Sequence, residues 1–171
     1  MKLLIHSTKQ SNRLRYTFDL IFKDVLGVDY EITDNKQTFI NHDGAKLNYS
    51  VKRISEQEVH IVNVGLLFRI GIQEQSFHVE EFKELPTFYQ TNDNSDLPFD
   101  PFAASFYLVS RYEEYLPYQP DQFGRFPAKA SVAYQNGFLK KPVVNHYANW
   151  IKELILEKFP ETIFPAKPFE F

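Results

Sequence analysis

The sequence of 171 residues contains no cysteine, which excludes disulfide bonds, thiolate nucleophiles and cysteine-ligated zinc or iron–sulfur centres. Its six glycines form neither a G-x-G-x-x-G nor a Walker arrangement, so no standard phosphate-binding loop is present. No apolar run approaches the roughly 18 residues that a membrane-spanning helix needs. The apolar run near the start, Leu3-Leu4-Ile5, is too short for a secretory signal peptide. We therefore expect a soluble, cytoplasmic protein.

The sequence also has no excess of basic over acidic residues. The formal net charge is −3 and the isoelectric point is near 6.0, which argues against a nucleic-acid partner and gives no polybasic anchor for a membrane. What the chain does have is apolar material: 43% of its residues are hydrophobic, among them 17 Phe and 10 Tyr. A chain of this length and composition can form one domain with an aromatic-packed core.

Strand and helix patterns alternate over the first 51 residues, which predicts crossover connections and an at least partly parallel sheet. Further strands are expected at 59–64, 75–82 and 85–89, as antiparallel hairpin strands added to the first sheet. The predicted fold class is α/β: a three-layer domain with a mixed, partly parallel sheet flanked by helices. The expected order at the start is a strand at 3–6, a helix from Ser11 or Asn12 to a stop at Gly27, a strand at 28–32, a short helix from Thr33 or Asp34 to Ile40, and a strand at 47–51.

The second half of the chain is predicted to be mainly helical. Asp100-Pro101 is a strong helix start, since an acidic N-cap precedes Pro at the first helical position, and Pro117 ends that helix. An irregular stretch at 118–137 is long enough to suggest a function, and an amphipathic helix follows at 143–159. We expect a single α/β domain over residues 1–160 and an extended linker over 161–171, leading toward a further C-terminal domain.

Phosphate and metal sites are weakly indicated. The loop after the first strand is rich in hydroxyl groups at a helix start, so Ser7, Thr8, Lys9 and Ser11 form a candidate anion site, although an ordinary capped loop is the favoured interpretation. No two of the five histidines have the spacing that would direct both at one ion from a helix. We expect no metal and no cofactor.

The segment Arg111 to Tyr115 combines charge with aromatic rings. Glu113 and Glu114 are expected at the C-terminal end of a helix. The helix dipole disfavours acidic side chains there unless a nearby cation pairs with them. Arg111 is one such cation, and Arg125 in the segment that begins at Asp121 is the other. We favour a clamp in which Glu113 or Glu114 holds the long loop through Arg125, over paired carboxylates in acid–base catalysis, because adjacent helical residues diverge.

Aromatic residues gather around the long loop, where they either stack on sugar rings or a partner, or hold the loop against the domain. The second interpretation is favoured from sequence alone. These residues are Tyr115, Tyr118, Phe123, Phe126 and Tyr134.

The run from Ser95 to Tyr115 (SDLPFDPFAASFYLVSRYEEY) resembles an N-terminal domain that precedes polysaccharide-deacetylase-like catalytic domains in bacteria. Residues 13–16, 121–127 and 141–145 continue the resemblance. It transfers no catalytic residue to this chain, because paired aspartates after an apolar strand and an H-x-x-x-H motif are both missing.

The resemblance implies a non-catalytic accessory domain that positions a glycan or braces a C-terminal deacetylase-like domain of the same protein. The full-length protein would then be a deacetylase-like hydrolase in carbohydrate metabolism. Two alternatives stay open. One is a stand-alone enzyme or binding domain for a nucleotide-sugar or sugar phosphate at the 7–12 loop, and the other is a folding or dimerisation partner without a ligand.

Overall fold

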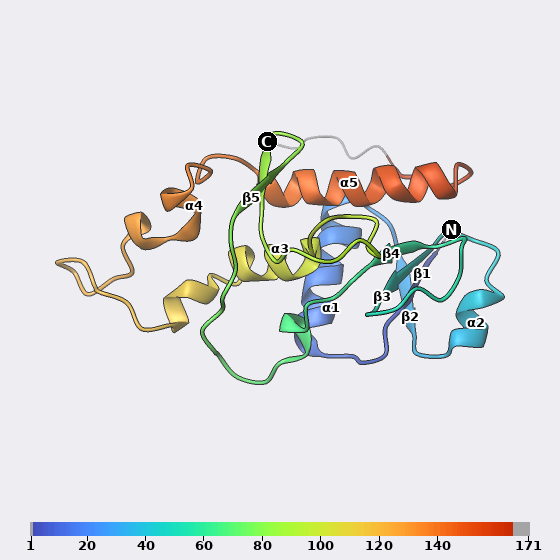
Figure 1. The fold of residues 1–171 in the computed structure, drawn as a ribbon, viewed down its shortest axis with the longest axis horizontal. Coiled ribbons are helices and arrows are strands. Elements are labelled where there is room, and N and C mark those ends of the chain that lie inside the picture. The colour runs from blue at the N-terminus through green and yellow to red at the C-terminus, as the bar shows by residue number, and fades with distance from the viewer. Residues whose placement is uncertain (1, 166–171) are drawn as a thin grey trace.

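The computed structural model, which describes residues 2–165, is built on a four-stranded sheet with the strand order β2-β1-β3-β4 (Figure 1). All three strand pairs are parallel. The alternation of strands and helices predicted parallel pairing among the first three strands, and this is confirmed. The strands are β1 (Leu3–His6), β2 (Tyr30–Thr33), β3 (Lys46–Tyr49) and β4 (Val59–Ile61).

The crossover from β1 to β2 is a single long helical segment. It starts as α1 (Asn12–Phe18), where the Ser11 side chain accepts the Leu14 N–H, and continues as a π-helix, η1 (Asp19–Val25). Gly27 then adopts a left-handed conformation (φ 70°). The next crossover carries the short helix α2 (Lys36–Ile40), whose N-cap is Asn35 rather than Thr33 or Asp34. Asn is as good an N-cap residue as Asp or Thr, which explains why the helix starts one or two residues later than predicted.

The two faces of the sheet differ in chemistry because side chains alternate along each strand. One face is apolar: Ile5, Leu47 and Ile61 belong to the main core, which is covered by α1, η1, α3 (Pro101–Val109) and α5 (Val143–Lys158). The opposite face carries buried polar residues and lies under α2 and the loop at 50–57. These residues are His6, Lys46, Asn48, Glu58 and His60.

The predicted antiparallel strands do form a hairpin, but not in the main sheet. β5 (Glu80–Phe82) and β6 (Leu85–Thr87) make a separate two-stranded sheet, and the strand at Val59 pairs in parallel with β3. The α/β fold class, with helices flanking the sheet, is confirmed, whereas the expectation that the antiparallel strands join the main sheet was wrong. Alternation identifies a strand but carries no information about its partner.

Helix α3 (Pro101–Val109) starts at Asp100, as predicted, and the Asp100 side chain accepts the N–H groups of Phe102 and Ala103. The helix ends earlier than predicted. Arg111 adopts a left-handed conformation (φ 53°), and a separate 3₁₀ helix, η3 (Tyr112–Tyr115), follows. A second 3₁₀ helix, η2 (Leu66–Phe68), follows β4.

Helix α5 (Val143–Lys158) closes the domain and agrees with its prediction to within one residue. Its aromatic residues pack on the rest of the core: Tyr147 lies 4.9 Å from Phe99, and Trp150 lies 5.1 Å from Phe82 between ring centroids. The aromatic-packed core is thus confirmed. Residues 161–165 follow α5, and residues 166–171 of the expected linker lie outside the described residues. No helix within residues 2–165 combines the length and the apolar character needed to cross a bilayer.

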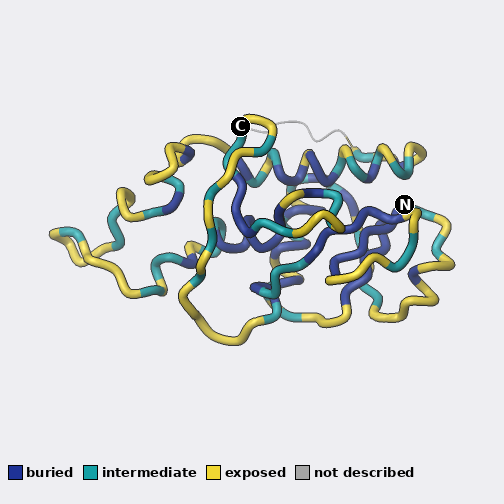
Figure 2. Tube along the Cα trace, in the orientation of Figure 1, coloured by how far each residue is buried: buried dark blue, intermediate teal, exposed yellow. Residues whose placement is uncertain are grey.

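A segment that we call the arm, residues 113–131, projects from the domain between Tyr112 and helix α4 (Val132–Gln135), at the left of Figure 1, and includes most of η3. It contains a one-turn 3₁₀ helix, η4 (Ala128–Ala130). No residue of the arm is buried, as Figure 2 shows. The arm is therefore the part of the chain that contributes least to the core.

Candidate functional site

The two acidic residues that sequence analysis singled out lie on η3, at the base of the arm, and not at the end of α3. Glu113 accepts the backbone N–H of Val132 at 2.8 Å. This contact joins the two ends of the arm. Burial raises the pKa of Glu113, the Val132 N–H opposes that shift, and the neighbouring Glu114 adds to it.

Arg125 is not the partner of either glutamate. Glu114 pairs with Arg111, whereas Arg125 pairs with Asp121, at 3.4 Å between Nε and Oδ2. The clamp therefore differs from the predicted one, since Glu113 holds a main-chain N–H rather than a guanidinium. Helix α4 begins at Val132, and its first N–H groups have no partner within the helix, so one of them is open to a carboxylate.

The tip of the arm is a tight turn organised by Asp121. One oxygen of this carboxylate accepts the N–H groups of Phe123 and Arg125, at 2.8 and 2.9 Å. These bonds, the Arg125 N–H first, hold the pKa of Asp121 below its usual range. Gly124 has φ 75°, a conformation that side chains disfavour. The Arg125 guanidinium lies 4.7 Å from the Phe123 ring centroid, so the tip presents a cation and an exposed ring together.

Two hollows adjoin along the arm and share Phe126 and Pro127. The larger, of about 520 Å³, lies between the Tyr107 and Glu113 side and the rings of Tyr118 and Phe126. These two rings meet edge to face, 5.2 Å apart. The second hollow, of about 460 Å³, is lined by both ion pairs of the arm, which are formed by Arg111, Glu114, Asp121 and Arg125. The hollows thus bring together the five charged residues predicted for the site, whereas Tyr115 and Phe123 line neither hollow.

Two of the four predicted anion-site residues, Ser7 and Ser11, use their hydroxyl groups in hydrogen bonds within the domain. The Ser7 hydroxyl donates to the Lys9 carbonyl oxygen at 2.7 Å, and the Ser11 hydroxyl donates to the Leu67 carbonyl oxygen at 2.5 Å. Ser11 also caps α1, which matches the favoured interpretation of an ordinary capped loop. Thr8 and Lys9 are exposed.

A buried polar cluster on the second face of the sheet escaped sequence analysis. The Glu58 carboxylate accepts the Asn48 side chain and the N–H groups of Ile54 and Ser55, at 2.9 to 3.0 Å. The His60 ring contacts the carbonyl oxygens of Asn94 and Ser50. These contacts hold the loop at 50–57 against the sheet. Alternation in β3 and β4 was the signal that could have revealed the cluster.

His6 lies beside Asn48 in the strand register and is fully buried. Neither ring nitrogen has a hydrogen-bond partner within residues 2–165, and burial lowers its pKa. Phe39 packs against the ring at 5.6 Å between centroids. Among the described residues, no group of three or more His, Cys, Asp or Glu side chains is placed to hold a metal ion.

Comparison with known proteins gives one family. No curated protein and no solved structure matches the chain. The sequence model of a family of unknown function, DUF7033, matches residues 3–160, which include the sheet, all five α-helices and the arm. The chain therefore belongs to the DUF7033 family.

Proposed function

We propose that this domain is a non-catalytic accessory domain of a polysaccharide-deacetylase-like protein, and that the hollows of its arm bind a glycan chain. The link to a deacetylase rests on the resemblance of residues 95–115, 121–127 and 141–145. The glycan site rests on the arm.

One observation carries the proposal: residues 113–131 bury no side chain, yet they present four aromatic rings, two of which line adjoining hollows together with two ion pairs. Aromatic residues that do not serve a core are costly to keep in water and mark binding surfaces. The rings are those of Tyr115, Tyr118, Phe123 and Phe126, and the exposed fractions of Tyr115 and Phe123 are 69% and 68%.

The chemistry of the hollows suits a sugar polymer. A ring face takes the apolar C–H face of a pyranose, and a phenol adds a polar group at its edge. Carboxylates accept hydrogen bonds from sugar hydroxyls, and guanidinium groups donate to them. The larger hollow offers the Tyr118 and Phe126 rings, and the second offers the ion pairs Arg111–Glu114 and Asp121–Arg125. The two hollows share Phe126 and Pro127, which supports their use as two successive sugar subsites.

The direct test is calorimetry with a panel of acetylated and deacetylated oligosaccharides. Truncating an aromatic anchor costs about 1–2 kcal/mol, so Tyr118→Ala and Phe126→Ala should each weaken binding roughly five- to thirtyfold. Tyr118→Phe keeps the ring and should bind within about threefold of wild type. Tyr16→Ala is the matched control, because Tyr16 is also exposed but lies in neither hollow.

A chain that binds none of these glycans would contradict the glycan site. Association of the wild type with a separately produced deacetylase domain, lost on Phe123→Ala without any glycan binding, would instead favour a bracing role.

A further inference from the structure

Positive charge is concentrated along the carboxyl ends of three strands, although the chain as a whole carries −3. The segments that leave β1, β3 and β4 are residues 7–15, 50–57 and 62–72. They contain a single acidic residue, Glu56, against six basic residues: Lys9, Arg13, Arg15, Lys52, Arg53 and Arg69.

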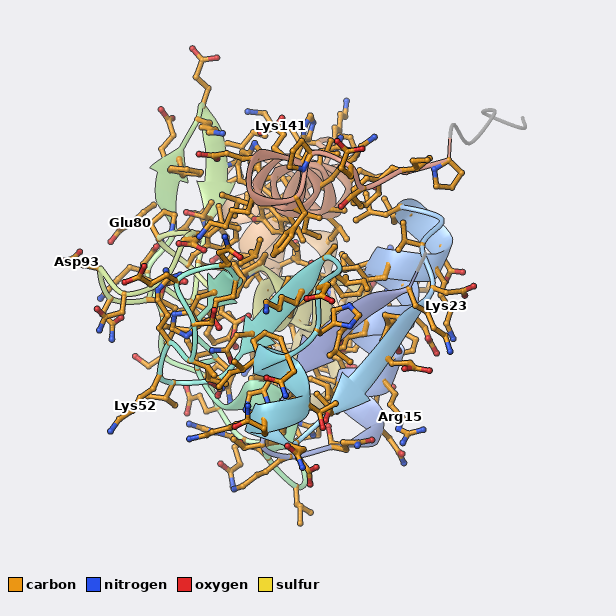
Figure 3. The ribbon with its side chains drawn as sticks, turned by 90° about the vertical axis from the view of Figure 1, so that its right-hand side faces the viewer. Arg15, Lys23, Lys52, Glu80, Asp93 and Lys141 are labelled. Carbon is orange, nitrogen blue, oxygen red and sulfur yellow. The ribbon has the colours of Figure 1, made fainter. Side chains whose placement is uncertain are left out.

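The fold brings these segments to one border of the molecule, because the carboxyl ends of parallel strands meet at the same edge. The Arg13 guanidinium donates to the carbonyl oxygens of Leu66 and Gly71, at 3.2 and 2.5 Å, which fixes the start of α1 against the loop after β4. In Figure 1 both loops run along the lower border. Figure 3 places Arg15 and Lys52 at this border, with Lys141 at the opposite one.

Three of the cations are available to a partner. Lys9, Lys52 and Arg69 are exposed, and their side chains make no ion pair or hydrogen bond within residues 2–165. Arg53 differs, since it pairs with Asp96 at 2.7 Å. Two glutamates lie close by: Glu56 follows Lys52 in the same loop, and Glu74 lines the same hollow as Arg69. The basic residues outnumber these acids, and a net positive border attracts an anionic surface.

Two aliphatic side chains stand among the cations. The exposed fraction of Ile70 is 94%, and it lies between Arg69 and Gly71, whose φ is 73°. The exposed fraction of Val51 is 62%, next to Lys52. Ile70 is thus held almost wholly in water beside a cation, in the part of the border fixed by Arg13.

We propose that this border docks on the surface of an anionic phospholipid bilayer, with the cations on the headgroups and Ile70 in the interfacial layer. Attraction to anionic lipids acts on basic residues near the surface, and buried apolar area adds to it. A soluble polyanion would use the cations but gain nothing from Ile70. From sequence alone no membrane partner was expected, because the six basic residues lie in three separate segments and form no polybasic run.

The test is co-sedimentation of the full chain with phosphatidylcholine vesicles that contain phosphatidylglycerol. Each basic residue near such a surface is worth about fivefold in partition, so Lys9→Glu/Lys52→Glu/Arg69→Glu should lower it by about a hundredfold or more. Ile70→Ser should lower it roughly three- to tenfold. The control is Lys140→Glu/Lys141→Glu at the far border, to be compared with the double variant Lys9→Glu/Lys52→Glu of equal charge change, and the control should retain most of the binding.

Absence of binding to the anionic vesicles overturns the proposal, and so does equal loss in the control variant. Binding to soluble polyphosphate at equal strength, with no effect of Ile70→Ser on vesicle binding, would assign the border to a soluble polyanion instead. Phosphatidylcholine vesicles alone should bind weakly, and strong binding to them would remove the role of charge. These outcomes are independent of glycan binding at the arm.

Discussion

The hydroxyl of Tyr49 donates a 2.8 Å hydrogen bond to the carboxylate of Asp100, 51 residues further along the chain. The same carboxylate accepts N–H groups from Val64, Phe102 and Ala103 at 2.9 to 3.0 Å. One fully buried acid therefore ties β3, the segment after β4 and the start of α3 together. It is the main polar connection inside an otherwise aromatic core.

Asp100→Ala should lower the free energy of unfolding by about 3–5 kcal/mol, because it leaves several buried donors without an acceptor. Tyr49→Phe removes one donor and should cost about 0.5–1.5 kcal/mol. Urea titration of both variants checks this. The role assigned to Asp100 would be wrong if its replacement cost no more than that of Tyr49.

Stability should also depend on pH through Asp100, because burial raises the pKa of this carboxyl from 3.8 to about 6. A raised pKa means that the folded state binds the proton more tightly than the unfolded chain. The contribution of Asp100 to stability is then complete below about pH 4 and is lost as the pH rises toward 6.

The measurement is the difference in unfolding free energy between wild type and Asp100→Asn at several pH values. The advantage of wild type should shrink by about 1–3 kcal/mol between pH 4 and pH 7. An advantage that grows toward neutral pH contradicts the raised pKa.

The turn between β5 and β6 should accept glycine. Lys83 and Glu84 have φ values of 50° and 64°, which are unfavourable for residues with a Cβ. Glu84→Gly should raise the free energy of unfolding by about 0.5–1 kcal/mol, or roughly 2–4 °C in melting temperature. Lys83→Gly is the comparison: it should gain less, since Lys83 also pairs with Glu153 and lies over Trp150.

Two buried histidines should respond in opposite ways to replacement by leucine. His6→Leu removes two ring nitrogens that have no partner among residues 2–165, so stability should be unchanged or higher by about 1 kcal/mol. His60→Leu leaves the carbonyl oxygens of Asn94 and Ser50 without their contact and should cost about 2–3 kcal/mol. Equal losses in thermal unfolding would mean that the His6 nitrogens do have partners.

Glu113 should control the order of the arm rather than the stability of the domain. Glu113→Ala removes the acceptor of the Val132 N–H, so trypsin should cleave at Arg125 and Lys129 about five- to tenfold faster, with little change in the main unfolding transition. Glu114→Ala removes only the pair with Arg111 and should have a smaller effect. Unchanged cleavage in Glu113→Ala would show that other contacts hold the arm.

Local signals explain which elements could be predicted from sequence. Ser11, Asp100-Pro101 and the apolar stripe of α5 each specify an element through neighbouring residues, and all three agree with the structure. The end of α3 could not be predicted in this way. The helix stops at a left-handed conformation of Arg111, and such a stop is normally recognised from a glycine, which is missing here. The separation of β5 and β6 from the main sheet also depends on tertiary packing, so it could not be predicted from neighbouring residues.

The candidate site was predicted in part for the same reason. The residues of the arm are close in sequence, so Arg111 to Tyr115 and Asp121 to Arg125 could be grouped in advance. The partner of Glu113 could not, since Val132 contributes a main-chain group that any residue would offer. The basic border depends on the parallel pairing of the strands, which places Lys9, Lys52 and Arg69 at the same edge of the sheet only after folding.

The arm also has a consequence for protein engineering. Its two ends meet where Glu113 bonds to Val132, and between them only Leu116, which is partly buried, packs against the core. Shortening, lengthening or exchanging residues 117–130 should therefore leave the folding unit intact, because the cost of closing the connection grows only slowly with its length. The domain can serve as a scaffold on which a foreign recognition loop is grafted between two fixed anchor points.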